Sequence, residues 1–379
     1  MMPLKNARGR FCGVMGLTAV LATTVAVNAQ QTSQTLREAF ADDFLIGAAL
    51  STRLPGGHDK VSTSMIAAQF NQVTPENCMK FGQIHPQPDR YNFTPADQLV
   101  AFAEKNKMTV VGHVLVWHNQ TPDWVFENAQ GKNLTRDELI ARMRKHMEAV
   151  LGRYKGRIKG WDVVNEAFNG NGTMRRTKWF EIIGADLLEV AFRNAHAVDP
   201  NIELYYNDYG MTGGGKRNAT VKLIEEFKAK GIRIDGVGMQ GHWGLGGPSI
   251  DAIEQSIITF AKTGVKVHIT ELDVDVLPGR KPNRGGDLTK EQYQKEVDPY
   301  RNGLPDDMQQ RLAKRYAALF GLFLKHKDKI ARVTFWGASD KYSWKNNYPI
   351  RGRVNHALLF DREAKPKPAF HAVMRLKSK

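Results

Sequence analysis

Short apolar runs alternate with longer amphipathic stretches along most of this chain. Beyond residue 36 the short runs are rich in Val and Ile, and each of them precedes a stretch in which apolar residues recur at helical spacing. Near-continuous apolar strands separated by helices are typical of a parallel sheet that is covered on both faces. The expected strands are Asp43 to Leu50, Gln72 to Pro75, Thr109 to Val116, Ile158 to Glu166, Glu203 to Asp208, Gly236 to Gly241, Lys266 to Val274 and Ala331 to Gly337.

The helical stretches complete an eightfold repeat. Examples are Leu139 to Tyr154, Trp179 to Val198, Val221 to Lys230 and Met308 to Lys325. Eight strand and helix pairs predict an α/β fold, a closed (β/α)₈ TIM barrel, with an open doubly wound sheet as the alternative. The segment from Leu277 to Leu304 is rich in Pro, Gly and charge, and we expect it to be an extended loop within a single domain.

The N-terminus has the pattern of a secretory signal peptide. Three basic residues precede an apolar run from Phe11 to Val27, which ends in Val27-Asn28-Ala29. A membrane anchor is the alternative, but it needs about 20 apolar residues, and this run contains three threonines. We therefore predict a signal peptide over residues 1–29, a mature domain over residues 30–379, and a secreted protein, periplasmic or extracellular, without a membrane anchor. Cleavage would leave Cys78 as the single cysteine, so no intrachain disulfide could form.

The composition argues against several function classes. The net charge is +15, but the basic residues are scattered, so nucleic acid is not an expected partner. Residues Gly236 to Gly241 satisfy a dinucleotide-binding pattern only where a strand is expected, and Gly210 to Lys216 nearly matches a phosphate loop but is followed by Arg217. His113 and His118 have no third ligand at a recognisable spacing. We expect a monomer with no cofactor and no metal ion.

Carboxylates and aromatic residues gather at the carboxyl ends of the expected strands. Glu166 ends the fourth strand, and Glu271 lies near the end of the seventh. Active sites of such barrels lie where strands end, and paired carboxylates suit acid and base catalysis at an acetal. The structural alternative is that each glutamate only pairs with a basic neighbour. That alternative does not explain the tryptophans expected at the same rim, which are Trp117, Trp243, Trp336 and Trp344.

Seven motifs make the chain similar to a known enzyme family. They are Thr74 to Lys80, Gly112 to His118, Trp161 to Ala167, Gly238 to Trp243, Ile269 to Asp273, Phe335 to Asp340 and Leu359 to Pro368. Together and in this order they resemble glycoside hydrolase family 10, the retaining endo-β-1,4-xylanases. The resemblance implies a (β/α)₈ barrel, an extracellular or periplasmic setting, and xylan and xylo-oligosaccharides as partners.

The resemblance also implies roles for individual residues. Glu166 would be the acid/base and Glu271 the nucleophile, with their carboxyl groups about 5 to 5.5 Å apart, as retention requires. Asn165 would hold the sugar 2-hydroxyl, and His242 with Asp273 behind it would keep the nucleophile ionised. Donor-side sugar contacts are implied for Glu76, Asn77, Lys80, His113, Trp117 and Gln240, with Gln120 near them. Trp336 and Trp344 would cover the cleaved sugar, and Tyr209 would be a platform on the leaving-group side.

Two alternatives remain at this stage. Phe81, Gly82 and Gly210 depart from common family residues, which leaves subsite preference open. A related retaining glycosidase acting on cellulose or mixed-linkage glucan would share the glutamates but need room for a hydroxymethyl group, and Lys80 and Trp344 are expected to crowd that space. A sugar-binding protein without catalysis would need neither glutamate.

Overall fold

Eight parallel strands close into a barrel. The computed structural model describes residues 34–279 and 290–378. Neighbouring strands pair in the order β6-β5-β4-β3-β2-β1-β9-β8, and a β6–β8 pairing closes the ring, while the short β7 pairs with β8 outside it. The strands are β1 (Leu45–Leu50), β2 (Gln72–Pro75), β3 (Thr109–Val116), β4 (Gly160–Asn165), β5 (Glu203–Asp208), β6 (Gly236–Met239), β7 (His242–Gly244), β8 (Lys266–Asp275) and β9 (Ile330–Phe335).

The closed sheet confirms the predicted (β/α)₈ barrel and rules out the open doubly wound alternative. All eight predicted strands are present, with ends that differ from the predicted ones by at most two residues. The predicted strand from Gly236 to Gly241 stops at Met239, and β7 follows it in place of a helix. The glycine-rich run therefore belongs to the barrel wall and does not open a helix, as a dinucleotide site would require.

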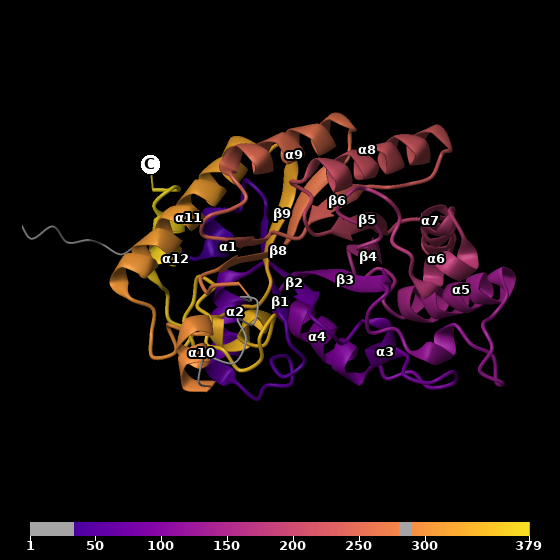
Figure 1. Ribbon diagram of the computed structural model, residues 1–379, viewed down its shortest axis with the longest axis horizontal. Helices are drawn as coiled ribbons and strands as arrows, with labels where there is room; N and C mark the ends of the chain where they lie inside the picture. The colour runs from indigo at the N-terminus through magenta and orange to yellow at the C-terminus, as the bar shows by residue number, and fades with distance from the viewer. Residues whose placement is uncertain (1–33, 280–289, 379) are drawn as a thin grey trace, which may run out of the picture. The chain divides into compact units, whose positions relative to one another are not determined.

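Helices cover the outside of the barrel, as Figure 1 shows for α4 to α9 and α11. The helices are α1 (Leu36–Ala39), α2 (Lys60–Gln69), α3 (Phe81–Ile84), α4 (Thr94–Lys105), α5 (Arg136–Arg153), α6 (Lys178–Ile183), α7 (Leu187–Val198), α8 (Gly214–Ala229), α9 (Ile250–Lys262), α10 (Lys290–Val297), α11 (Asp306–Lys325) and α12 (Pro368–Met374), with 3₁₀ turns at Asp123–Val125, Asp340–Tyr342 and Trp344–Asn346.

Local signals explain where these helices begin and end, and they correct two predictions. A capping box starts α5, because the Thr135 N–H donates to the Glu138 carboxylate at 2.8 Å. The single helix predicted from Trp179 to Val198 is wrong, since Gly184, with φ of 100°, ends α6 before α7 begins. The prediction of an extended loop from Leu277 to Leu304 is wrong in part, because α10 lies within it.

The barrel interior combines close packing with a buried polar network beneath the active face. A Cβ atom at Gly112 in β3 would lie 2.2 Å from the Trp161 ring, so only glycine lets the two strands pack this way. Asp162 accepts a hydrogen bond from Nδ1 of His113 at 2.9 Å, and both side chains are 2% exposed. Burial and this contact fix the His113 imidazole, which lies within β3 and lines the cleft.

The predicted signal peptide, residues 1–29, lies outside the described residues. Among residues 34–279 and 290–378, none of the helices has the length and apolar character needed to cross a membrane.

Candidate active site

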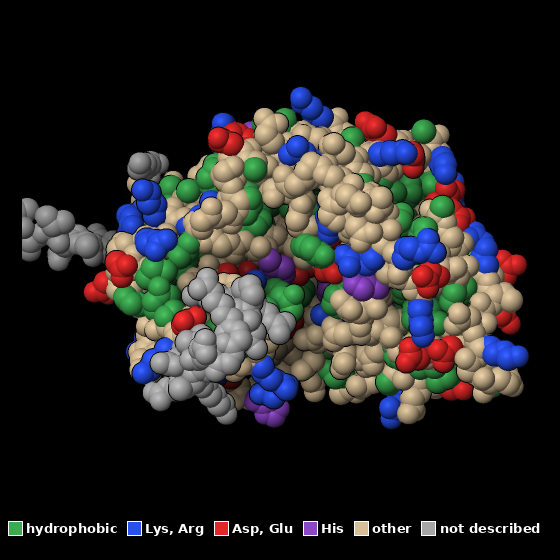
Figure 2. Space-filling model, viewed as in Figure 1, with side chains coloured by type: hydrophobic (Ala, Val, Ile, Leu, Met, Phe, Trp, Pro, Cys, Tyr) green, Lys and Arg blue, Asp and Glu red, His purple; other side chains and the backbone are tan. Residues whose placement is uncertain are grey.

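A cleft of about 630 Å³ opens at the carboxyl ends of the strands. Figure 2 shows a hollow near the centre of the visible face, in which histidine, acidic and basic side chains lie together. Eleven predicted site residues line the cleft: Lys80, His113, Trp117, Asn165, Glu166, Tyr209, Gln240, His242, Glu271, Trp336 and Trp344. The strand ends thus bring together side chains from far apart in the sequence.

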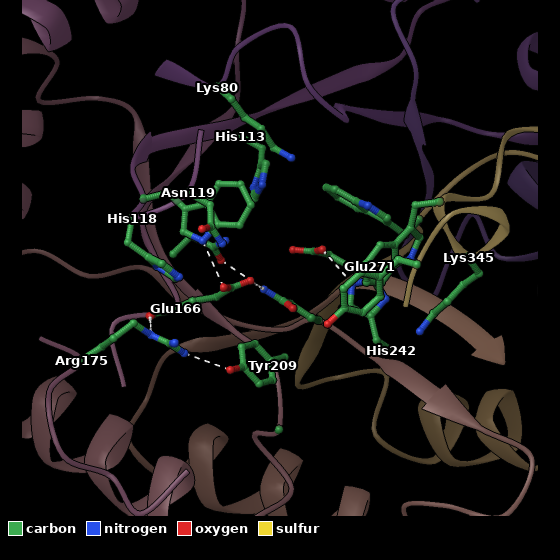
Figure 3. A pocket seen from close by; sticks show the side chains of 17 residues that line it. Lys80, His113, His118, Asn119, Glu166, Arg175, Tyr209, His242, Glu271 and Lys345 are labelled. Carbon is green, nitrogen blue, oxygen red and sulfur yellow. Dashed lines mark hydrogen bonds and ion pairs between the residues drawn. The ribbon is translucent and has the colours of Figure 1, made fainter. Parts of the chain in front are cut away.

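Glu166 follows β4 directly and points into the cleft (Figure 3). Its carboxylate accepts hydrogen bonds from Nε1 of Trp117 at 3.1 Å and from Nε2 of Gln240 at 3.0 Å. Its φ of 59° is left-handed, a conformation that costs about 1 to 3 kcal/mol for a residue with a side chain. The surrounding contacts must offset this cost, which is typical of a residue whose direction matters.

Glu271 lies deeper, on β8, and is 5% exposed. Nδ2 of Asn207 donates to its Oε1 at 2.7 Å, and Nε2 of His242 lies 3.1 Å from its Oε2. The other imidazole nitrogen of His242 lies 2.9 Å from the carboxylate of Asp273, which also accepts a bond from Nε1 of Trp344 at 2.7 Å. Every oxygen of the Glu271 carboxylate therefore has a donor.

The same contacts set the charges of this group. Burial lowers the pKa of His242, but the charges and hydrogen bonds of Asp273 and Glu271 outweigh it and raise that pKa to about 9. Burial also works to raise the pKa of Glu271, yet the hydrogen bond and charge of His242, the charge of His113 and the bond from Asn207 lower it overall. At neutral pH an imidazolium thus lies between two carboxylates, and Glu271 is ionised.

This arrangement predicts a pH effect for Asp273→Asn. Loss of the Asp273 charge should lower the pKa of His242, and a neutral imidazole would no longer favour ionised Glu271. The family resemblance implies that Glu271 is a nucleophile, and a nucleophilic carboxylate must be ionised. On that expectation the acid limb of the kcat/KM profile should move to higher pH by about one unit. Hydrolysis rates between pH 3 and 8 measure this shift, with the surface variant Asp328→Asn as control. A uniform loss of activity with an unmoved acid limb would contradict the coupling.

Lys80 follows β2 and belongs to a second polar group of the site, together with Glu76 and Asn77. Its ammonium lies 4.7 Å from the centre of the Trp117 ring and 3.2 Å from Oδ1 of Asn77. Burial lowers the pKa of Lys80, while the charges of Glu271, Glu76 and Glu166 oppose that change. Burial likewise raises the pKa of Glu76, against the charge of Lys80. The Lys80 amine therefore lies in the cleft lining, within the electrostatic reach of Glu76, Glu166 and Glu271.

Three predicted sugar contacts are not part of the cleft lining. Glu76 and Asn77 are half-buried beside Lys80, and Gln120 is exposed, with Nε2 3.4 Å from Oδ1 of Asn77. These residues are near the predicted donor side, but none is part of the lining of the cleft. Their contact with a sugar stays a prediction.

Aromatic rings form much of the cleft wall. Trp336 lies with its ring centre 5.3 Å from that of His113, and Trp344 lies 4.7 Å from the His242 ring. Tyr209 is 42% exposed and lies beside Arg175, below the Glu166 carboxylate in Figure 3. Trp243, expected at the same rim, is instead buried in β7, where its ring faces Phe323, so that prediction is wrong. Successive side chains of a strand point to opposite faces, so Trp243 points away from the cleft that its neighbour His242 lines, and it packs in the core.

Sequence reasoning did not assign several residues that the structure places at the site. Asn207 contacts Glu271, and its signal was available, since it is a polar residue at the end of an apolar strand. Asn207 is not part of the cleft lining, but six unassigned residues are: His118, Asn119, Arg175, Gly210, Lys345 and Tyr348. Tyr348 is 56% exposed and stacks on Trp344 with ring centres 4.8 Å apart. Among the described residues no group of three or more His, Cys, Asp or Glu side chains could hold a metal ion.

A family model matches this chain over nearly its whole length. The model of glycosyl hydrolase family 10 matches residues 35–376. The chain belongs to this family. The family model spans all eight barrel strands and the cleft, and the resemblance inferred from the seven motifs is confirmed.

Individual family 10 members are similar over nearly their full lengths. Endo-1,4-beta-xylanase A of Xylanibacter ruminicola is 46% identical over 368 residues, which are 97% of this chain and 98% of the relative. Beta-1,4-xylanase of Dictyoglomus thermophilum is 42% identical over 342 residues, 90% of each protein. Among solved structures, a GH10 endoxylanase from a sugarcane soil metagenome has a TM-score of 0.85 at 46% identity, covering 91% of this chain and 99% of that one. A mutant solved with xylotriose has a TM-score of 0.80 at 37% identity, covering 90% and 99%.

Proposed function

We propose that this protein is a retaining endo-β-1,4-xylanase that cleaves internal bonds of xylan by double displacement. The observation that carries the proposal is the unequal environment of two carboxylates in one cleft. Glu271 is buried and held ionised by His242, whereas Glu166 lies at the cleft wall beside Trp117 and Gln240. Such a difference suits one carboxylate for attack and the other for proton transfer.

In the first step Glu271 would attack the anomeric carbon of the sugar. A bond forms between its carboxylate oxygen and that carbon while the glycosidic bond breaks, and Glu166 gives its proton to the departing oxygen. Asn165 lies between the two glutamates, 3.0 Å from Nδ2 of Asn207 and 3.2 Å from Nε2 of Gln240, where it can reach the sugar 2-hydroxyl.

In the second step Glu166 would act as a base. It takes a proton from a water molecule whose oxygen bonds to the anomeric carbon, and the bond to Glu271 breaks. Two inversions give net retention of the anomeric configuration. This mechanism requires the carboxyl groups to lie about 5 to 5.5 Å apart, close enough for one sugar carbon to reach both.

The choice of xylan over a glucan rests on the relatives and on crowding of the cleft. The relatives described above are named xylanases, and one neighbour was solved with xylotriose. Lys80, Trp336 and Trp344 all line the same cleft. Their bulk supports a pentose, because a hexose would need room for its additional hydroxymethyl group.

Incubation with xylan and with a soluble cellulose derivative, followed by NMR of the earliest products, tests the proposal. We expect β-anomers from xylan first, and little release from the cellulose derivative. Initial α-anomers would overturn the retaining mechanism. Faster release of sugar from the cellulose derivative would identify a glucan, not xylan, as the substrate. If the folded protein hydrolyses neither polymer, the result would favour a sugar-binding protein without catalysis.

We also propose that the chain is exported, because xylan is too large to enter a cell. The basic and apolar pattern of residues 1–29 supports this proposal. N-terminal sequencing of the exported protein should begin at Gln30, and an N-terminus that retains Phe11 to Val27 would contradict it.

A further inference from the structure

Arg175 lies in the cleft wall beside the backbone of Glu166. A tight hairpin after β4 brings it there: Asn169 N–H donates to the Thr173 carbonyl at 2.8 Å, and Arg175 N–H donates to the Ala167 carbonyl at 2.7 Å. The chain thus folds back within ten residues of the glutamate. Figure 3 shows the guanidinium between Glu166 and Tyr209, with contacts to both.

The guanidinium makes two hydrogen bonds from different nitrogens. Its Nε donates to the backbone carbonyl of Glu166 at 3.1 Å, and Nη2 lies 2.9 Å from the hydroxyl of Tyr209. Its charge also interacts with the carboxylates of Glu166 and Asp208. Because the guanidinium is planar, two bonds to fixed partners define its position.

Three contacts hold the left-handed backbone of Glu166. Its N–H donates to the carbonyl of Asn207 at 2.9 Å, and the next N–H, of Ala167, donates to the Tyr206 hydroxyl at 3.2 Å. Both of these partners belong to β5, which is part of the barrel wall. The third contact, from Arg175 to the Glu166 carbonyl, is the one that comes from a loop and carries a charge. Rotation of this peptide would swing the carboxylate away from Trp117 and Gln240.

We propose that Arg175 is a positioning residue that holds Glu166 in the orientation needed to protonate the departing sugar oxygen. The inference rests on the proposed function, which makes Glu166 the acid/base. Arg175 acts through the backbone of Glu166 and through its positive charge, and it takes part in no bond-making step. Its effect should therefore be confined to steps that need proton transfer.

Two aryl xylobiosides separate this role from a general structural one. Unsubstituted phenolate leaves poorly without a proton, whereas 2,4-dinitrophenolate leaves unaided. General acid catalysis contributes about 10²- to 10⁴-fold to the rate. Arg175→Gln should lose part of this contribution, so kcat/KM on the phenyl glycoside should fall by about 10- to 100-fold. Activity on the dinitrophenyl glycoside should stay within about threefold, since no proton is needed in that step.

The neighbouring Arg176 provides a matched control. Its side chain is 77% exposed and lies 3.8 Å from the Glu181 carboxylate, away from the cleft. Arg176→Gln removes the same charge and should leave both activities unchanged. Equal losses on both glycosides for Arg175→Gln, or no loss on either, would overturn the inference.

The alkaline limb gives a second readout. The positive charge of Arg175 favours the ionised form of Glu166, and the alkaline limb of kcat/KM reports the loss of the proton from the acid. Removal of Arg175 should therefore shift this limb on the phenyl glycoside to higher pH. Lys80, His118, Tyr206 and Asp208 also interact with Glu166, and they are unchanged in the variant. An alkaline limb that stays in place or moves to lower pH would contradict this electrostatic part.

Further variants keep the test decisive. If Arg175→Gln does not fold by circular dichroism, Arg175→Lys keeps the charge and should show a smaller loss with the same preference for the dinitrophenyl glycoside. Glu166→Ala separates the two proposals. If it shows no such preference, the acid/base assignment fails; if it does and the Arg175 variants do not, only the positioning role fails.

Discussion

Replacing Glu271 by Gln is expected to reduce kcat on xylan by on the order of 10⁵- to 10⁶-fold, as loss of a catalytic nucleophile does elsewhere. The amide has nearly the same shape and can still accept the hydrogen bond from Asn207, but it has no negative charge with which to attack the anomeric carbon. His242 would then face one carboxylate, Asp273, in place of two. Reducing-sugar release at a high enzyme concentration measures the residual rate.

Glu226→Gln is the matched control for this change. Glu226 lies on α8, is 54% exposed and pairs with Lys222 at 3.6 Å, so its loss should leave activity unchanged. The melting temperature of Glu271→Gln should stay close to that of the unchanged protein, because the buried position becomes neutral and remains hydrogen-bonded. A loss below tenfold would remove Glu271 from the chemistry and would support a binding protein.

A slow-reacting 2-fluoro xylobioside would show whether the attacking atom belongs to Glu271. The fluorine destabilises the oxocarbenium-like transition states of both steps, and a good leaving group restores only the first, so the covalent intermediate accumulates. Mass spectrometry of the digested protein should place the added sugar on the peptide that contains Glu271. Labelling at Glu166 would reverse the two roles.

Much of the fold could be predicted because the barrel strands are buried on both faces. β4 contains Val163 and Val164 between Trp161 and Asn165, and every residue of this strand is buried. Such runs are recognisable in the sequence as apolar segments. The first polar residue after such a segment marks the end of the strand. Glu166 could be selected for this reason before any contact between strands was known. Glu271 lies within β8, which continues to Asp275, but its side chain still lines the cleft.

The remaining elements depend on contacts that a local pattern does not contain. The apolar spacing continues across Gly184, so the break between α6 and α7 appears only through its backbone conformation. Arg175 reaches Glu166 because a hairpin reverses the chain, and nothing in helical or strand periodicity marks that reversal. Asn207 is different, because its place at the end of β5 follows the same rule that selected Glu166.

Glu166→Ala should produce the second largest effect, and its size should depend on the leaving group. On phenyl β-xylobioside we expect kcat/KM to fall by about 10³- to 10⁴-fold, near the upper range for general acid catalysis. On the 2,4-dinitrophenyl glycoside kcat/KM should change little, since that first step needs no proton. Both kcat and KM should fall on it, because removal of the base slows hydrolysis of the covalent intermediate.

Added azide distinguishes a missing base from a damaged site. The alanine leaves space where Nε1 of Trp117 and Nε2 of Gln240 contacted the carboxylate, and a small anion can enter it. Azide needs no proton removed to attack the anomeric carbon, so it should restore kcat on the dinitrophenyl glycoside and yield a β-xylobiosyl azide. An α-product would mean that attack comes from the other face and that the reaction inverts overall. Absence of rescue, with Glu271 still labelled by the fluorinated sugar, would place the base elsewhere in the cleft.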